Sequence, residues 1–277
     1  MEKDIHVHSP SKGQSNKKPV PQSSKCKLKF KYAASPDGVD TNILLLLHGL
    51  GDTLQPFFNL GNKLQLPQTA VMALQAPDLI PLMGECYQWY PSFNMMTGEE
   101  LSPSHPEQKK GIITTGILLT ELIQHLIQDC HYQAQHIFLF GFSQGGTVAL
   151  NQVLQGPIRN LGGVVSIAGY EPFLSSSSQL PSVKYDGPIL VLQGEKDPVI
   201  GSKANGEKMF SQIKNACTST NNNSDRLQQI FIPNKSEHSM PSNQSEWRYI
   251  HAFFAKHMPR RNLRLEKMSD VYEIQLN

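Results

Sequence analysis

The hydrophobic positions of this chain gather in short runs that are separated by longer stretches of mixed character. Each run has four or five residues and is almost wholly apolar: Ile43–Leu47, Ala70–Leu74, Ile137–Phe140, Val164–Ala168, Ile189–Leu192 and Gln229–Ile232. Strands that are buried on both faces have this composition, and they occur in parallel sheets covered by helices. A further strand is predicted near the start of the pattern, because Leu28, Phe30 and Tyr32 alternate with lysines, as on a strand with one solvated face.

The stretches between the runs have the period of helices. Apolar residues recur three and four positions apart between Ile112 and Cys130, and similar patterns cover Thr147–Gln155, Asn205–Asn215 and Trp247–His257. Strand and helix therefore alternate along the chain, which is typical of a doubly wound, mostly parallel sheet with helices on both faces. The predicted fold class is α/β, and the alternation continues without a break through one domain, residues 26–258.

Both ends of the chain lie outside this pattern. Residues 1–25 are rich in Lys, Ser, Pro and Gln and almost free of apolar side chains. We expect a disordered tail there, because such a segment cannot bury enough surface to offset the entropy lost on ordering. Residues 259–277 are charged and have few apolar positions, and we expect them to form a loosely attached extension.

Composition and charge exclude several functional classes. The 277 residues carry 25 Lys and Arg against 23 Asp and Glu, and a net charge of +2 is too balanced to predict nucleic-acid binding. No apolar run approaches the roughly 20 residues of a membrane-spanning helix. Four scattered cysteines without a CxxC pair, and an N-terminus without an apolar leader, predict reduced thiols in a cytoplasmic protein. The sequence does not indicate an oligomeric state.

The most informative segment is residues 141–146, Gly-Phe-Ser-Gln-Gly-Gly, which contains the pattern Gly-x-Ser-x-Gly. A predicted strand enters it and a predicted helix leaves it, which is the context of a nucleophilic serine on a sharp turn. The flanking glycines remove side-chain clashes at the turn, so that the hydroxyl of Ser143 projects above the carboxyl edge of the sheet. The alternative interpretation is a glycine-rich turn whose serine only caps the helix.

A serine hydroxyl needs a base that takes its proton, and in this architecture the chain order is serine, acid, histidine. Only His238, His251 and His257 follow Ser143. The last two belong to the predicted C-terminal helix, whereas His238 lies in a loop directly after the last strand. We therefore predict His238 as the general base, with a loop histidine of no function as the alternative.

The acid is expected in the loop after the preceding strand. Asp197 lies there in a tight turn framed by glycine and proline, where its carboxylate would fix the imidazole tautomer and stabilise the imidazolium. Glu195 is a local competitor and Glu171 a more distant one. Asp197 could instead cap the next helix.

The tetrahedral intermediate of acyl transfer requires preorganised N–H donors. One is expected from the backbone of Gln144, directly after the serine. The other is expected from Leu50, in the glycine-containing loop that follows the Ile43–Leu47 strand. A plain strand-to-helix turn is the alternative for this loop.

Together these segments resemble the phospholipase/carboxylesterase family of α/β-hydrolases, which includes acyl-protein thioesterases and lysophospholipase-like esterases. The matching motifs are His-Gly-Leu-Gly-Asp at 48–52, Gln-Ala-Pro at 75–77, Gly-Phe-Ser-Gln-Gly-Gly at 141–146 and Asp-Pro at 197–198. The resemblance extends from about Ile43 to Met258.

The resemblance implies Ser143, Asp197 and His238 as the catalytic triad, with the amides of Leu50 and Gln144 as the oxyanion hole. It also implies cleavage of an ester or thioester without a metal or an organic cofactor.

Several positions depart from the family pattern, including Ala168, where the family commonly has serine. Gln193 replaces a histidine before the acid, Gly201 replaces a proline after it, and Lys235 replaces a glycine before the base. Glu171 would put a carboxylate near a long acyl chain, where its burial would be unfavourable. These changes leave the catalytic set intact and bear on the substrate.

The segment between Leu79 and Met96 is rich in apolar and aromatic side chains. We expect it to cover an apolar acyl-binding groove, with Met83, Trp89 and Tyr90 as substrate-binding residues. The family has a similar aromatic pair at the positions of Trp89 and Tyr90. Ordinary packing of these side chains against the sheet is the alternative.

The predicted function is therefore that of a serine esterase or thioesterase acting on an acyl chain carried by a protein or a lysophospholipid. A carboxylesterase for small esters is one alternative. A non-catalytic binding protein that retains the hydrolase fold is the other.

Overall fold

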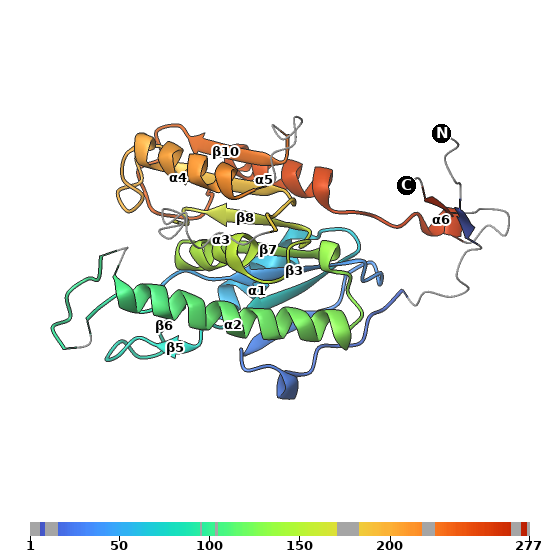
Figure 1. The fold of residues 1–277 in the computed structure, drawn as a ribbon, viewed down its shortest axis with the longest axis horizontal. Helices are drawn as coiled ribbons and strands as arrows, with labels where there is room; N and C mark the ends of the chain where they lie inside the picture. The colour runs from blue at the N-terminus through green and yellow to red at the C-terminus, as the bar shows by residue number, and fades with distance from the viewer. Residues whose placement is uncertain are drawn as a thin grey trace.

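The computed structural model describes residues 6–8, 16–94, 96–102, 105–170, 183–217, 225–266 and 273–275. Within these ranges, strands and helices alternate around one central sheet (Figure 1). The strands are β1 (His6–His8), β2 (Phe30–Ala33), β3 (Asn42–Leu47), β4 (Thr69–Leu74), β5 (Asp78–Leu79), β6 (Tyr87–Gln88), β7 (Ile137–Phe142), β8 (Gly163–Ile167), β9 (Ile189–Gly194), β10 (Leu227–Ile232) and β11 (Glu273–Gln275). The helices are α1 (Leu54–Leu64), α2 (Pro106–Gln128), α3 (Gln144–Gln155), α4 (Lys203–Ala216), α5 (Gln244–His257) and α6 (Leu263–Glu266), with 3-10 turns at Ser23–Lys25 and Ala134–His136.

The central sheet has seven strands in the order β10-β9-β8-β7-β3-β4-β2. All neighbours are parallel except β2, which runs antiparallel to β4 at one edge. This arrangement confirms the predicted α/β class with a mostly parallel, doubly wound sheet. At the carboxyl end of β3, Leu47 pairs with Gly141 of β7, so the loops after these two strands begin side by side.

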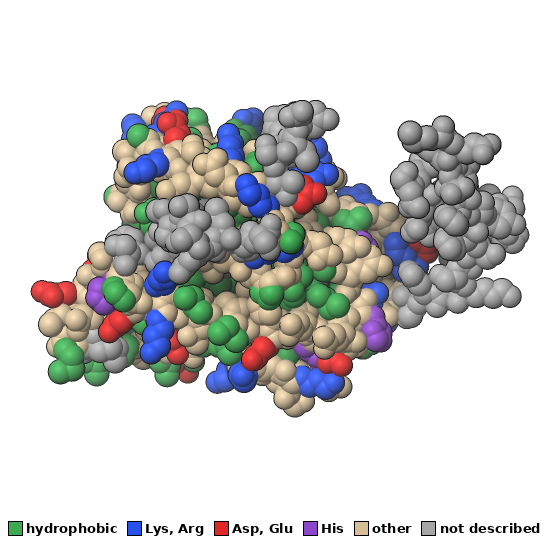
Figure 2. All heavy atoms as spheres, viewed as in Figure 1, with side chains coloured by type: hydrophobic (Ala, Val, Ile, Leu, Met, Phe, Trp, Pro, Cys, Tyr) green, Lys and Arg blue, Asp and Glu red, His purple; other side chains and the backbone are tan. Residues whose placement is uncertain are grey.

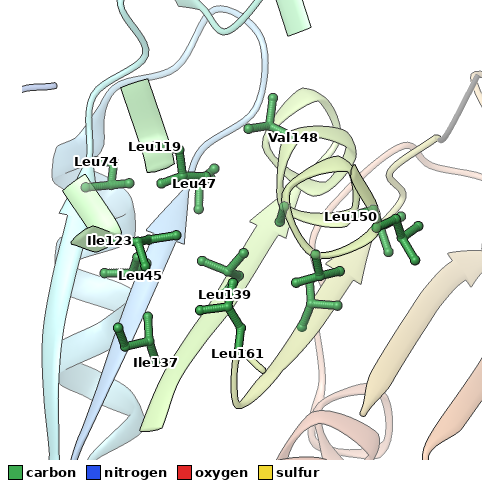
Figure 3. Packing of buried hydrophobic residues seen from close by; sticks show 14 of the residues in the cluster. Leu45, Leu47, Leu74, Leu119, Ile123, Ile137, Leu139, Val148, Leu150 and Leu161 are labelled. Carbon is green, nitrogen blue, oxygen red and sulfur yellow. The ribbon is translucent and has the colours of Figure 1, made fainter. Parts of the chain in front are cut away.

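Helices cover both faces of the sheet and bury a separate apolar layer on each. Side chains from α2, α3 and α4 pack on one face with β3, β4 and β7. Figure 3 shows this layer, with Leu119 and Ile123 of α2 against Leu45 and Leu47 of β3. Side chains from α1 and α5, such as Phe57 and Phe253, pack on the opposite face.

Successive residues of each central strand point into opposite apolar layers, so these strands are almost wholly apolar, as the sequence predicts.

Helix α1 is an element that the sequence analysis does not predict. It contains Pro56 and Gly61, two residue types that usually interrupt helices. Pro56 lies in the first turn, where a missing N–H costs nothing. A Cβ on Gly61 would collide with the side chain of Val71, so the glycine allows the helix to lie close against β4. Both apparent breakers are thus compatible with the helix.

The start of the chain differs from the prediction of disorder through residue 25. From residue 16 onward the backbone is described and bonded to the domain: the Asp40 N–H donates to the Asn16 carbonyl at 2.7 Å, and the Gln22 N–H donates to His125 Nε2 at 3.1 Å. Backbone hydrogen bonds to the domain hold this stretch despite its polar composition. Residues 1–5 and 9–15 lie outside the described residues.

The other end of the chain is also attached where it leaves α5. Gln68 accepts a hydrogen bond from the Arg261 N–H at 2.8 Å and donates one to the Arg261 carbonyl at 2.9 Å. Further along, β11 pairs with β1 in an antiparallel two-stranded ribbon. Residues 259–261 are therefore bonded to the domain rather than loosely attached, because the side chains of Asn42 and Gln68 pair with the backbone of Pro259 and Arg261.

Among the described helices, none combines the length and the apolar character needed to cross a bilayer. The face shown in Figure 2 has Lys and Arg side chains interspersed with Asp and Glu, in keeping with the balanced charge of the sequence.

Candidate active site

Ser143 occupies a strained turn between β7 and α3. Its backbone angles are φ 52° and ψ −119°, a conformation that costs free energy for any residue with a side chain. The turn is anchored by its neighbours, since the Ser143 N–H donates to the Ile167 carbonyl of β8 at 2.9 Å. A Cβ on Gly141 would overlap the backbone of Gly145, so the sharp crossing requires glycine there.

Three side chains from distant parts of the chain form one hydrogen-bonded line at the carboxyl edge of the sheet. The Oγ of Ser143 lies 2.8 Å from Nε2 of His238, and Nδ1 of His238 lies 2.8 Å from Oδ2 of Asp197. With the Nδ1–H donated to the carboxylate, Nε2 is the acceptor for the serine hydroxyl. His238 follows β10 and Asp197 follows β9, in the chain order that the sequence predicts.

Asp197 is held rigidly for a loop residue. It is only 1% exposed, and its Oδ1 accepts hydrogen bonds from the N–H groups of Val199 at 2.9 Å and Ile200 at 3.4 Å. The carboxylate therefore organises its own turn and the imidazole together.

The competing acids and histidines lie elsewhere. The carboxylate of Glu195 accepts from the Asn234 N–H and pairs with Lys203 on the surface. His251 and His257 pack in tilted contacts against Trp247 and Phe253 of α5 itself. Glu171 lies outside the described residues.

The loop that carries His238 is anchored by a buried ion pair that the sequence analysis does not predict. Lys235 Nζ lies 3.0 Å from Glu246 Oε2 and donates to the Met240 carbonyl at 3.1 Å. The Lys235 carbonyl accepts from the Lys196 N–H at 2.9 Å, which joins the base loop to the acid loop. The pattern Asn-x-x-Glu at 243–246 signals a helix start and could have drawn attention to Glu246, but nothing in the sequence indicates its pairing with Lys235.

The backbone amides of Leu50 and Gln144 lie at the two loops that adjoin Ser143. Gln144 is the first residue of α3, where amides have no acceptor within the helix. Within the described part of the chain, neither amide has a hydrogen-bond acceptor. A Cβ on Gly145 would overlap the carbonyls of Leu47 and His48, so this glycine lets α3 begin directly against the loop that holds Leu50.

A cavity of about 560 Å³ opens at Ser143 and includes Leu50 and Gln144 in its walls. Helix α4 forms one wall with Asn205, Lys208 and Met209, among others. The lining also includes Tyr90, Ser92, Glu100, Leu101 and Gln108. It contains both polar and apolar side chains, so the cavity is not a purely hydrophobic channel.

The three residues expected to bind substrate lie in different surroundings. Tyr90 lines the cavity. Met83 is 54% exposed on the turn between β5 and β6 and does not contribute to the cavity walls. Trp89 has no exposed surface; it lies over His48 with ring centroids 5.3 Å apart and donates its Nε1–H to the His48 carbonyl at 2.7 Å. The packing alternative therefore describes Trp89, and a cavity-lining position describes Tyr90.

His48 is a further buried polar group at this end of the sheet. Its Nδ1 lies 2.7 Å from the Gly49 carbonyl, and its Nε2 accepts from the Ala76 N–H at 3.1 Å. Burial lowers the pKa of His48 below its ordinary value, so the ring is neutral at pH 7 and can donate at one nitrogen while accepting at the other.

A family model described as Phospholipase/Carboxylesterase matches residues 30–247 of this chain. The chain belongs to the phospholipase/carboxylesterase family. The matched range includes Ser143, Asp197 and His238 and covers the chain from the loop after β3 to the loop after β10. The fold and the family match together therefore identify the protein as a hydrolase of this family.

Individual relatives in this family differ in how much they share. An uncharacterised hydrolase of Mycosarcoma maydis is 40% identical over 158 residues, which are 54% of this chain and 58% of that protein. The match thus spans less than two thirds of that relative. Acyl-protein thioesterase 1 homolog 1 of Dictyostelium discoideum is 23% identical over 68% of this chain and 82% of its own length.

A solved structure of a carboxylesterase has the same fold as this chain. The carboxylesterase of Bacillus cereus superposes with a TM-score of 0.62 at 17% identity and covers 84% of this chain and 96% of its own.

Two observations concern metals and thiols. Among the described residues, no group of three or more His, Cys, Asp or Glu side chains is arranged to hold a metal ion. The four cysteines, all within the described ranges, are free thiols.

Proposed function

We propose that this protein is a serine hydrolase that cleaves carboxylic esters or thioesters through an acyl-serine intermediate. The observation that carries the proposal is the hydrogen-bonded line from Ser143 through His238 to Asp197, with both key distances at 2.8 Å. A hydroxyl, an imidazole and a buried carboxylate in this order activate the hydroxyl as a nucleophile.

In the first half of the reaction, Ser143 Oγ forms a bond to the carbonyl carbon while its proton moves to His238 Nε2. The carbonyl oxygen becomes an oxyanion, which the N–H groups of Leu50 and Gln144 stabilise, and the positive end of α3 adds to this field. When the intermediate collapses, the bond to the leaving alcohol or thiol breaks, and the leaving group takes the proton from Nε2.

In the second half, His238 takes a proton from water as that water attacks the acyl-serine. The new tetrahedral intermediate uses the same two amides. Its collapse releases the carboxylic acid and returns the proton to Ser143 Oγ. Asp197 remains ionised and stabilises the imidazolium in both halves.

The family includes acyl-protein thioesterases and lysophospholipase-like esterases, and a Dictyostelium relative is named as such a thioesterase. An acyl chain on a protein or a lysophospholipid is therefore the first substrate class for this site. Leu101, Ile200 and Met209 supply apolar contacts for part of such a chain.

The lining of the cavity favours a second candidate, a carboxylesterase for small or polar esters. Asn205 lines the wall with an exposed side-chain amide, and an alkyl chain placed against it would remove it from water without offering a hydrogen bond. The charged groups Glu100 and Lys208 also face the cavity. A short acyl group would need only the apolar part of the wall near Ser143.

Labelling with a fluorophosphonate probe tests the catalytic proposal. We expect the probe to modify wild-type protein and Ser211→Ala, in which an exposed serine of α4 is removed, but not Ser143→Ala. Absence of labelling in folded wild-type protein would favour the non-catalytic binding protein.

A series of p-nitrophenyl esters from acetate to palmitate, with matched thioesters, separates the two substrate classes. A maximum of kcat/KM at two to four carbons, with a fall of at least about tenfold by twelve, identifies the small-ester enzyme, since each further methylene must lie against polar groups. A maximum at long chains identifies the thioesterase-like enzyme. The cytoplasmic location remains a prediction, with which four free thiols are compatible.

A further inference from the structure

We propose that Trp89 and the side chain of Gln144 are positioning residues. They fix the positions of the two oxyanion-binding amides, those of Leu50 and Gln144. The inference rests on the proposed acyl transfer at Ser143 and adds a role for the segment 87–92, which supplies no group to the reacting atoms. Neither side chain touches the substrate in this proposal. Each acts through the backbone of Leu50 or Gln144.

The first observation concerns the loop that holds Leu50. The backbone on both sides of Leu50 is bonded to the segment 87–92: the His48 carbonyl accepts from Trp89 Nε1–H at 2.7 Å, and the Gly51 N–H donates to the Tyr87 carbonyl at 2.8 Å. The Leu50 amide lies between these two attachment points. Its direction is therefore set by where the segment lies.

The second observation concerns Gln144, the residue that provides the other amide. Its side chain is buried and is hydrogen-bonded to the same segment. Its Oε1 accepts from the Trp89 N–H at 2.9 Å, and its Nε2 donates to the Tyr90 carbonyl at 3.0 Å and to Ser92 Oγ at 2.6 Å. All three hydrogen bonds lie in the buried interior, where each is stronger than in water and costly to lose.

These hydrogen bonds connect the two amides through Trp89. The loop that holds Leu50 is bonded to Trp89 through the indole N–H, and Trp89 is bonded to Gln144 through its own backbone N–H. The strand pairing of β3 with β7 ends at Leu47 and Gly141, before either amide is reached. The segment 87–92 therefore continues the connection beyond the sheet.

Such a connection matters because oxyanion donors act only within a narrow geometry. Each donor must lie about 2.7–3.1 Å from the developing oxyanion, and complete loss of one donor costs about a hundredfold or more in rate. Loosening one amide by a few tenths of an ångström is expected to cost part of that amount. Ground-state binding of the ester depends little on it, so kcat rather than KM should change.

The test uses Trp89→Phe, which keeps an aromatic ring against His48 and removes the indole N–H. The matched control is Tyr185→Phe at the other end of the sheet, where the buried Tyr185 hydroxyl donates to the Leu161 carbonyl at 3.1 Å. Both variants lose one buried hydrogen bond from an aromatic side chain to a backbone carbonyl. We expect the urea midpoint to fall in both, and further in Trp89→Phe, because the smaller ring also leaves buried space unfilled.

Only Trp89→Phe should impair the chemistry. With p-nitrophenyl acetate we expect kcat to fall about tenfold, with KM within about twofold of wild type, and Tyr185→Phe to keep kcat within about twofold. Phenylboronic acid, which forms a tetrahedral adduct with an active-site serine, should bind Trp89→Phe more weakly by about the same factor. The pH profile of kcat/KM should keep its midpoint, because His238 is not affected.

The variant Gln144→Met provides an independent test, because it keeps the backbone amide of residue 144 and removes the three side-chain hydrogen bonds. The same pattern is expected, and the double variant should lose less than the product of the two single losses. Equal kcat in Trp89→Phe and Tyr185→Phe, or unchanged boronic acid affinity, would overturn the proposal. If Ser143→Ala retains activity, the proposed function itself is wrong; if Ser143→Ala is inactive and both positioning variants are normal, only the present inference is wrong.

Discussion

The ammonium group of Lys235 lies 3.0 Å from the carboxylate of Glu246, and the two side chains are only 6% and 11% exposed. This pair joins the loop that carries His238 to the first turn of α5. Burial by itself would raise the pKa of Glu246, but the Ser242 N–H and the Lys235 ammonium outweigh it and hold the pKa below its ordinary value. The carboxylate is therefore ionised at pH 7 and fully compensated.

Replacing Glu246 by Gln should leave Lys235 as a buried charge without its partner. We expect a loss of about 3 kcal/mol in the free energy of unfolding at pH 7 and a fall in kcat, since the His238 loop loses its anchor. The double variant Lys235→Met/Glu246→Met is the control, because an apolar pair of similar size removes the uncompensated charge. Urea denaturation measures both; equal stabilities of Glu246→Gln and wild type would contradict the role of the pair.

The same substitution has a defined pH dependence. Because the pKa of Glu246 is lower in the folded protein than in the unfolded chain, its contribution is present above the unfolded value of about 4.5 and is lost as the pH falls through the folded value. The difference in stability between wild type and Glu246→Gln should therefore narrow below about pH 4. A constant difference from pH 7 to pH 3 would show that the carboxylate's charge does not matter.

Replacing Asp197 by Asn should keep the fold and remove the catalytic alignment. The Asn carbonyl can still accept from the Val199 N–H, but the side chain no longer offers a carboxylate to His238 Nδ1. We expect kcat to fall about ten-thousand-fold with a melting temperature close to that of wild type. A variant that keeps more than about a tenth of wild-type kcat would show that Asp197 is not the acid.

Replacement by alanine should change stability in opposite directions at two helical glycines, Gly145 and Gly116. Propensity alone favours alanine at both Gly145 and Gly116 by up to about 1 kcal/mol. A Cβ on Gly145 would overlap the carbonyls of Leu47 and His48, whereas a Cβ on Gly116 meets its nearest atom at 3.7 Å. We expect Gly145→Ala to lose about 3 kcal/mol or more of unfolding free energy and Gly116→Ala to gain about 0.5 kcal/mol. Thermal denaturation of the two variants side by side checks this difference in sign.

The neutral state of His48 should make stability depend on pH. Burial holds its pKa below the ordinary value, so the unfolded chain binds a proton at a pH where the folded protein does not. Since the unfolded state then holds more protons, stability falls as the pH decreases from 7 toward the folded pKa. In His48→Gln this contribution is absent, and we expect a shallower decline between pH 7 and pH 5 in urea titrations.

The pKa values of His136 and His257 are also lowered by burial, and both residues remain in the variant. Some acid sensitivity should therefore persist, and the difference between the two curves isolates His48. Parallel curves would mean that His48 is no harder to protonate in the folded protein than in the unfolded chain.

Most of the sheet could be predicted because its central strands are buried on both faces and are almost wholly apolar. Helix α1 was not predicted because Pro56 and Gly61 usually interrupt helices; here Pro56 lies in the first turn and Gly61 lies close against Val71. The attachment of residues 16–25 was equally inaccessible, since it depends on hydrogen bonds to residues far along the chain, such as His125.

The candidate site shows the same division. Ser143, Asp197 and His238 follow from chain order and from loops at the ends of strands, and in the structure they form one hydrogen-bonded line. Trp89 shows the limit: its residue type and neighbourhood suit a groove equally well, and only its contact with His48 reveals that it is interior.

The position of β10 at the edge of the sheet has a consequence for how activity is lost. Within the described ranges this strand pairs with β9 alone, most of its residues are partly solvated, and the loop beyond it carries His238. Fraying of one border strand would thus disconnect the base while β7 and β3 stay intact in the middle. Under mild heat or denaturant, the proposed hydrolytic activity should therefore decline before the bulk of the molecule unfolds.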